Sequence, residues 1–231
     1  MLTATASVGV ATPIYRRAMS AFSREPEGRP RSGEIDLLVW QEVARIRGEW
    51  IVDPCLSTIE RTLGIDEEAR QLTARISQRD SHLLDELIAG WIKAYDRIPT
   101  ADTIASFANA AHADARRQVL CEDLYSLIPP ESIAERHRAA RSASRPHQGA
   151  ASPDPHRWRD RTAAASPMAE SIVLRTWQTA HSADFILLAL ALVDVRLQDR
   201  LPIPVTPLDP LAEVLTSLIH DQLVAQGLPP A

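Results

Sequence analysis

Four residues within a short stretch combine an aromatic ring with positive charge. Trp158 lies between Arg157 and Arg159, and Arg161 follows two positions later. An indole ring can stack on a nucleic-acid base while guanidinium groups contact phosphates, which contributes about 1–3 kcal/mol per stacked base. Tryptophan and arginine are also the residue types that dominate protein interfaces. The motif therefore predicts a segment that binds RNA, DNA or a partner protein.

Trp158 also has an explanation that requires no partner. Trp40, Trp91 and Trp177 recur within amphipathic helical patterns, which places them in an expected hydrophobic core. No such pattern surrounds Trp158, but any apolar surface within reach would stabilise a large buried ring. Folding back onto the chain's own helices is therefore the alternative to partner binding.

A second candidate is a helix-turn-helix unit. The helical pattern of residues 83–94 breaks at 96–99 and resumes at residue 101, which would direct Arg116 and Arg117 toward DNA. The connection lacks the usual glycine and is longer than the standard turn. The acidic residues that follow Val119 would also repel phosphate. A simple helical hairpin fits the same pattern.

Two groups of residues have the types, but not the spacing, of a catalytic site. His220 and Asp221 form the doublet of a metal-dependent phosphohydrolase, but that chemistry needs further ligands, and only ten residues follow the doublet. His181, Ser182 and Asp184 are the types of a hydrolytic triad, but triads assemble from distant segments around an oxyanion hole. Such close spacing predicts a helix cap at Ser182 or Asp184 instead.

Other reactive residues are too sparse for a metal or cofactor site. Cys55 and Cys121 are far apart, and no Cys-x-x-Cys motif occurs. The eight glycines are scattered, so no phosphate-binding loop is predicted. No Glu-x-x-His pair indicates a di-iron site. We expect no catalytic residue, no metal ligand and no cofactor, and a pocket in the helical core is the one enzymatic alternative.

The composition favours helices and disfavours a wholly nucleic-acid-binding protein. Hydrophobic residues make up 45% of the chain and charged residues 24%, as in ordinary globular proteins, whereas aromatic residues make up only 5%. Abundant alanine and leucine favour helices over strands. The net charge of −5 lacks the basic footprint of a DNA-binding domain. Local basic patches are still compatible with it.

Hydrophobic spacing predicts an all-α protein, an irregular bundle of about eight helices. Serine, threonine or aspartate before a helical pattern supplies N-caps, and proline often occupies the first helical position. The apolar run from Phe185 to Val193 predicts a central helix covered on every side. The expected helices cover 33–46, 54–63, 66–76, 81–94, 101–127 (as one helix or as two with a break near His112), 131–140, 167–177, 185–193 and 210–226.

These elements form two helical blocks, 32–140 and 167–231. A flexible connector rich in arginine, proline and serine joins them over 141–166, because almost no apolar pattern survives there. Residues 1–31 predict a disordered tail, and residues 1–24 have the composition of an organellar transit peptide as an alternative. The longest apolar run reaches about half of the roughly 20 residues that a membrane span needs. We expect no membrane association and a cytoplasmic location.

These features favour a non-enzymatic helical subunit or adaptor of a larger assembly, with other protein subunits as partners. Helical small subunits of nucleoprotein machines, such as RNA-guided CRISPR effector complexes, are an example of this physical type. RNA or DNA would bind through the basic connector or through Arg116 and Arg117. The alternatives are a helix-turn-helix DNA-binding regulator and a small-molecule enzyme with a pocket in its helical core.

Overall fold

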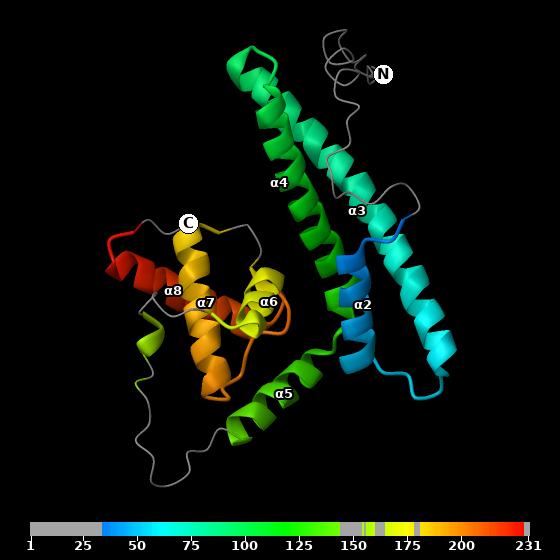
Figure 1. Ribbon diagram of the computed structural model, residues 1–231, viewed down its shortest axis with the longest axis vertical. Helices are drawn as coiled ribbons and strands as arrows, with labels where there is room; N and C mark the ends of the chain where they lie inside the picture. Colours follow the sequence, from blue (N-terminus) through cyan, green and yellow to red (C-terminus); the bar gives the residue numbers. More distant parts are fainter. Residues whose placement is uncertain (1–33, 144–153, 155, 160–164, 178–180, 229–231) are drawn as a thin grey trace, which may run out of the picture.

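The computed structural model describes residues 34–143, 154, 156–159, 165–177 and 181–228 (Figure 1). These residues contain seven α-helices and no strand, which confirms the all-α prediction. The predicted tail and most of the predicted connector lie outside the described residues. The helices are α2 (Leu37–Glu49), α3 (Thr58–Tyr95), α4 (Ala101–Val119), α5 (Pro130–Ala143), α6 (Pro167–Thr176), α7 (Ala183–Gln198) and α8 (Pro210–Ala225).

Buried hydrophobic residues form two separate cores. The first core joins α2, α3 and the end of α4 through residues such as Val43, Ile76 and Leu124. The second core joins α6, α7 and α8, with Phe185 and Leu188 fully buried. Each core brings together the apolar faces of at least three helices, the arrangement that removes most apolar surface from water. Among the described residues, no helix combines the length and apolar composition needed to cross a bilayer.

The sequence prediction was wrong about α3, which is one helix of 38 residues instead of three. It begins after Ser57, where Ser57 and Glu60 form a capping box, and not at Asp53 and Pro54. Gly64 does not end the helix. A glycine inside a helix costs only about 1 kcal/mol relative to alanine, and burial of Leu72 about two turns later more than offsets that.

Helices α3 and α4 form a long hairpin that extends away from the second core (Figure 1). Ala108, Ala111 and Ala115 are buried in the α4 face, and such small side chains let two helices approach closely. The chain shows no break at His112, whose Nδ1 atom lies 3.3 Å from Oδ2 of Asp80. The segment 101–119 is therefore a single α-helix.

A π-helix, Leu120–Leu124, follows α4 and changes the direction of its side chains. The wider turn keeps Leu120 and Leu124 buried in the first core. It also places Asp123 2.5 Å from Arg75 of α3, and Glu122 3.2 Å from Arg79. The two ion pairs tie the end of α4 to the middle of α3.

The second core is centred on α7, in part as predicted. Its side chains pack against α6, α8 and a short 3₁₀ turn at Arg157–Arg159. The helix is not covered on every side, because Leu187 is 48% exposed. Similarly, α8 buries Leu215 and Ile219, whereas Val214 of the same predicted stripe is 62% exposed. The predicted apolar faces are wider than the surfaces that the fold covers.

Candidate partner-binding surface

Trp158 lies in the second hydrophobic core. Its side chain is only 2% exposed, and the 3₁₀ turn that carries it packs on α7. The structure therefore shows the fold-back arrangement, in which the ring is not accessible to a base or to a partner. The physical reason is that the second core offers the indole an apolar surface, and burial of a large aromatic ring stabilises the fold by several kcal/mol.

Arg157, beside Trp158, fastens this turn to the end of α7. Arg157 donates two hydrogen bonds to the carboxylate of Asp199, at 2.7 and 2.9 Å. These hydrogen bonds lower the pKa of Asp199 below its usual value. Arg159 is exposed, with its guanidinium carbon 5.9 Å from the centre of the Trp158 ring. Arg161 lies outside the described residues.

Arg116 and Arg117 lie near the end of α4 and are both half-buried. Arg117 lies 3.3 Å from Asp114 of the same helix. In a helix-turn-helix unit the second helix crosses the first steeply and is free to enter a groove. Here α4 packs along α3 as an antiparallel hairpin (Figure 1). These two arginines therefore lie on the packed α3–α4 hairpin, whereas Trp158 belongs to the second core.

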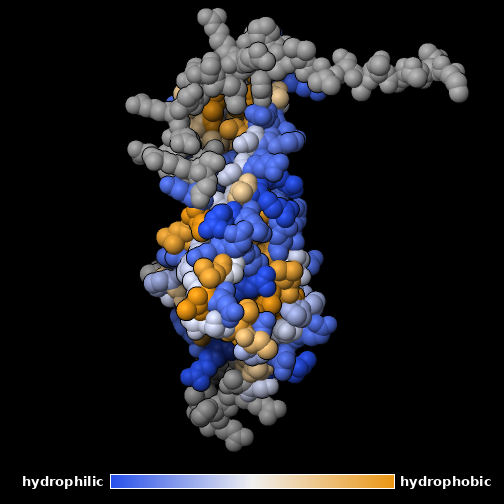
Figure 2. Space-filling model, turned by 90° about the vertical axis from the view of Figure 1, so that its right-hand side faces the viewer, coloured by the Kyte–Doolittle hydropathy of each residue, from blue (hydrophilic) through white to orange (hydrophobic). Residues whose placement is uncertain are grey.

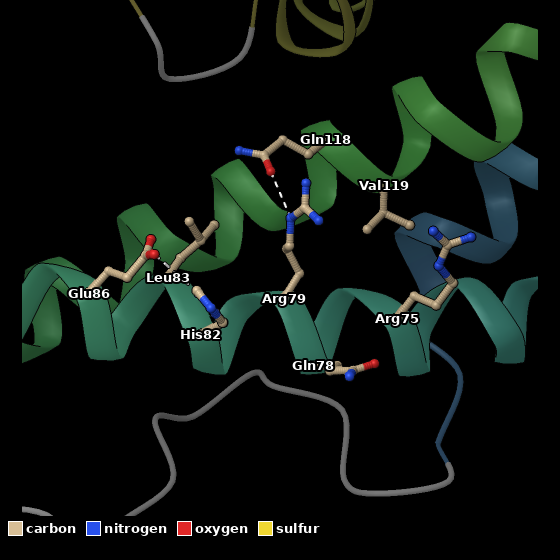
Figure 3. Close-up of a pocket in the computed structure, with 8 residues that line it drawn as sticks. All are labelled: Arg75, Gln78, Arg79, His82, Leu83, Glu86, Gln118 and Val119. Atoms are coloured by element: carbon tan, nitrogen blue, oxygen red, sulfur yellow. Dashed lines mark hydrogen bonds and ion pairs between the residues drawn. The ribbon is translucent and has the colours of Figure 1, made fainter. Parts of the chain in front are cut away.

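A shallow groove of about 480 Å³ runs between the middle of α3 and the end of α4 (Figure 3). Arg79 crosses it and donates a hydrogen bond to Gln118 at 2.8 Å. Two other side chains of the groove contact acidic groups of the chain: Arg75 lies 2.5 Å from Asp123, and His82 lies 3.4 Å from Glu86. No group of three or more metal-ligating side chains gathers among the described residues. Ser182 is the N-cap of α7, as predicted, and accepts from the N–H of Phe185.

The outer end of the α3–α4 hairpin, which we call the tip, carries an aromatic cluster. Trp91 lies against Tyr95, with ring centres 4.3 Å apart, and its edge meets Phe107 at 5.8 Å. The guanidinium carbon of Arg97 lies 5.8 Å from the centres of both the Trp91 and the Tyr95 rings, within the range of cation–π attraction. Tyr95 is 56% exposed and Ile98 47% exposed.

Within the described part of the chain, Trp91, like Trp50 beside the first core, lacks the indole hydrogen bond that Trp40 and Trp177 make. Trp40 donates its indole N–H to Asp66 at 2.6 Å, and Trp177 donates its own to Thr216 at 2.7 Å. The indole N–H of Trp91 has no acceptor among the described residues. Buried indoles usually find one, and a missing acceptor costs about 1–3 kcal/mol. Because Tyr95 and Ile98 are about half exposed, the tip is an aromatic surface that its own chain covers incompletely.

Sequence reasoning assigned Trp91 to the core and did not single out Tyr95 or Arg97. A signal was present, because Trp91 and Tyr95 are four residues apart and immediately precede the Ile98-Pro99 break. Aromatic residues at the end of a helical hairpin have few neighbours available to cover them. Only the length of α3 as a single helix shows how far the tip extends from the rest of the chain.

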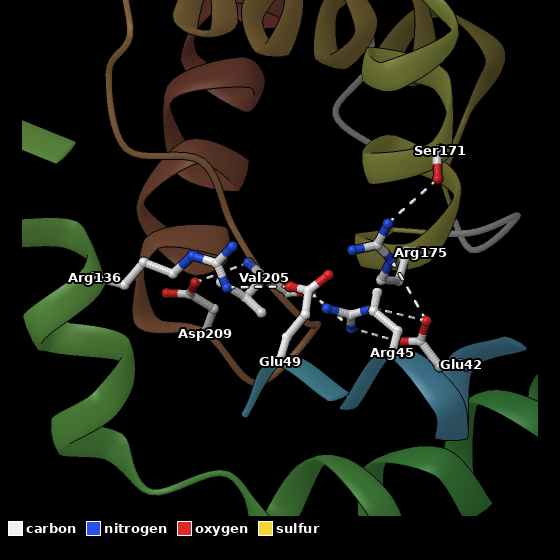
Figure 4. Close-up of polar contacts among 8 residues, drawn as sticks. All are labelled: Glu42, Arg45, Glu49, Arg136, Ser171, Arg175, Val205 and Asp209. Atoms are coloured by element: carbon white, nitrogen blue, oxygen red, sulfur yellow. Dashed lines mark hydrogen bonds and ion pairs between the residues drawn. The ribbon is translucent and has the colours of Figure 1, made fainter. Parts of the chain in front are cut away.

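A polar network joins the two blocks (Figure 4). Glu42 of α2 accepts two hydrogen bonds from Arg45, at 2.6 and 3.0 Å, and lies 3.8 Å from Arg175 of α6. Burial favours the neutral carboxyl group, but the hydrogen bonds and charges of both arginines, with the Tyr125 hydroxyl, lower the pKa of Glu42 overall. Burial and the same carboxylate raise the pKa of Tyr125 well above its usual range.

A second junction lies at the start of α8. The Asp209 carboxylate is fully buried, accepts from the N–H of Val205 at 2.9 Å and caps α8. His137 of α5 places Nε2 3.2 Å from the same carboxylate, but without the alignment of a hydrogen bond. Arg45 extends from α2 to the carbonyl oxygen of Val205 at 3.5 Å. Both blocks therefore contact the segment before α8.

Two histidines of the second block gather around Phe185. His181 stacks on the Phe185 ring at 4.0 Å, and the ring centres of His181 and His220 are 6.1 Å apart. Burial lowers the pKa of His181, and the nearby positive charges of His220 and Arg117 lower it further. Protonation of His181 therefore opposes the folded arrangement.

We predict that Trp158→Ala lowers the free energy of unfolding by about 3–5 kcal/mol, the usual cost of removing a buried tryptophan. Arg159→Ala, one position away and exposed, should change it by no more than about 0.5 kcal/mol. Urea unfolding followed by circular dichroism measures both. Equally small effects of the two substitutions would show that the ring is not buried.

We predict that the free energy of unfolding decreases as the pH falls below about 6.5, the ordinary pKa of histidine. The folded state holds the pKa of His181 below that value, so the unfolded state binds more protons as the pH falls. His181→Gln should reduce this slope, whereas His82→Gln, at an exposed position, should leave it unchanged. Urea titrations between pH 7.5 and 5 measure the slopes. A slope unaffected by His181→Gln would contradict the prediction.

Known proteins provide no further guide to this surface. Comparison with protein-family models, with curated proteins and with solved structures finds no match. The tip, the two junctions and the buried Trp158 turn are therefore interpreted from their geometry alone.

Proposed function

We propose that this chain is a non-enzymatic helical subunit or adaptor that binds a partner protein through the tip of the α3–α4 hairpin. The observation that carries the proposal is the incompletely covered aromatic cluster of Trp91, Tyr95 and Arg97. Tryptophan, tyrosine and arginine are the residue types that contribute most to protein interfaces. The cluster lies at the far end of a long hairpin, where a partner can approach without meeting the second core (Figure 1).

The tip suits a protein better than a nucleic acid. Its basic residues, Lys93 and Arg97, are balanced by Asp96 and Asp102, so no excess positive charge attracts phosphates. The proposed nucleic-acid contacts of the connector are weakened by the burial of Trp158. RNA or DNA is therefore a second partner class, and the helix-turn-helix alternative has no freely exposed second helix to support it.

We further propose that the chain acts in the cytoplasm. Cys55 and Cys121 are free thiols, and Cys55 is exposed. Disulfides are common in oxidising compartments and rare in the reducing cytosol. Two unpaired cysteines in a chain of this size are consistent with a reducing environment.

We predict that the double substitution Tyr95→Asp and Ile98→Asp lowers affinity for the native partner more than tenfold. The substitutions replace two apolar contact residues with charged ones at the centre of the proposed interface. A loss of 1.4 kcal/mol in binding free energy lowers the affinity tenfold. The matched control is Val214→Asp with Leu218→Asp, on an exposed face of α8. The measurement is quantitative co-purification of tagged full-length chains from native extract, with nuclease-treated and untreated arms.

Selective loss of a protein from the tip variant, with or without nuclease, supports the proposal. Three outcomes contradict it. In the first, the tip and control variants recover the bound protein equally. In the second, the unmodified chain loses its bound protein as soon as nuclease is added, and in the third it binds no protein at all. Circular dichroism of each variant confirms that the helices are retained. The nuclease-sensitive outcome would favour the nucleoprotein alternative.

A further inference from the structure

The opposite end of α3 carries a groove of about 870 Å³. It lies between the segment that follows α2 and the first turns of α3. Figure 2, which views the side of the molecule where α3 lies, shows hydrophobic residues among hydrophilic ones on this lower part. Apolar lining residues include Ile51, Val52, Leu56 and Ile65. Leu56 and Val52 are 42% and 52% exposed, so the groove is apolar and uncovered by the described residues.

Gly64 is one of the groove-lining residues. It lies in the interior of α3, and a side-chain carbon added there would meet no atom within 4 Å. Packing within the described chain therefore does not require a glycine, although glycine weakens the helix by about 1 kcal/mol relative to alanine. Ile59 and Leu63, which precede Gly64 on α3 outside the groove lining, are 74% and 63% exposed.

The groove has an acidic lining. Its charged side chains comprise four acidic and two basic residues, a net charge of −2: Asp53, Glu60, Glu67 and Glu68 against Arg47 and Arg61. Arg47 and Glu68 already pair through two hydrogen bonds of 2.7 Å. Glu67 is also paired, with Arg70 just outside the lining. Asp53 and Glu60 against Arg61 then leave a net charge of −1, which favours an occupant that is both apolar and basic.

The described chain begins at the level of this groove along α3. The backbone N–H of Asp36 donates a hydrogen bond to the Thr73 hydroxyl of α3 at 3.2 Å. Gln71, two residues before Thr73, already lines the groove. Residues 1–33 therefore join the described chain at the level of the groove along the helix axis, but on the opposite side of α3, because two residues correspond to a rotation of about 200°.

We propose that the N-terminal segment, residues 8–24, is the occupant of this groove. These residues lie outside the described part of the chain, and their sequence identifies them. Met1 to Arg24 contains no acidic residue and three arginines, and Tyr15, Met19 and Phe22 recur at the i, i+4, i+7 spacing of one helical face. The disordered tail predicted from the sequence then corresponds to this segment when it is not docked. This proposal concerns a different end of α3 from the tip and does not depend on it.

The chain between the proposed segment and the start of the described residues, which we call the tether, is long enough to reach the groove. Gly64 and Thr73 are nine residues apart, which corresponds to about 14 Å along the axis, and they lie on opposite faces of a helix about 10 Å across. The twelve residue steps from Phe22 to Glu34 span up to about 40 Å when extended, which is enough to pass around α3. A short tether gives an effective concentration in the millimolar range, so even a weak contact would be occupied in most molecules.

Disulfide trapping in the full-length chain tests the proposal. Cys55→Ser and Cys121→Ser remove the native thiols, Met19→Cys labels the segment, and Gly64→Cys labels the groove. The control replaces Gly64→Cys with His82→Cys, an exposed position on the same face of α3 and nine residues from Thr73 in the other direction. A segment that samples its surroundings without docking would reach both positions equally.

In a glutathione redox buffer we expect the 19–64 disulfide to form at least tenfold faster than the 19–82 disulfide, at a rate independent of protein concentration. Arg16→Glu with Arg17→Glu should abolish the difference, because the acidic lining then repels the segment. Equal rates at the two positions would overturn the proposal. Cross-linking that appears only between two chains, and rises with concentration, would overturn it in favour of a second copy as the occupant.

Discussion

The arrangement of the molecule depends on one ionised carboxylate between two hydrophobic cores. Glu42 belongs to the first core's α2, but it is stabilised both by Arg45 and, across the junction, by Arg175 of α6. A buried charge that loses a partner costs about 3–5 kcal/mol, so the two blocks cannot separate without a penalty or rehydration of this group. Apolar packing builds each block, whereas charge and hydrogen bonding fix how the blocks meet.

This junction determines which surfaces are free. It joins the end of α2 and the segments beyond α4 to the second block, so most of α3 is left with α2 and α4 as its neighbours. Both ends of that long helix then present uncovered apolar groups, aromatic at the tip and aliphatic at the groove. The two blocks pack together at the junction, whereas the α3–α4 hairpin extends away from it (Figure 1). Such a shape is suited to connect other molecules. The proposed adaptor function and the proposed docking of the N-terminal segment follow from the same geometry at opposite ends of α3.

Local sequence signals predicted the fold class and several helix starts, including Ser166 before α6 and Asp209 before α8. They failed at Gly64, because the free energy that carries α3 through it comes from burial of residues a turn or two later. The fate of Trp158 could not be predicted either, since the carboxylate of Asp199 that fixes its neighbour Arg157 is 42 positions away. Residue type identified the tryptophan as unusual. Only the fold shows which surface covers it.

The most direct test of this account is a double-mutant cycle between Glu42 and Arg175, measured by urea unfolding of the full-length chain. The variants are Glu42→Gln, Arg175→Met and their combination. We expect a coupling free energy of about 1 kcal/mol or more, as for contacting residues in one network. The exposed pair Glu49 and Arg136 should give a smaller value, because solvent screens it. A Glu42–Arg175 coupling indistinguishable from zero would show that the two blocks do not meet through this carboxylate.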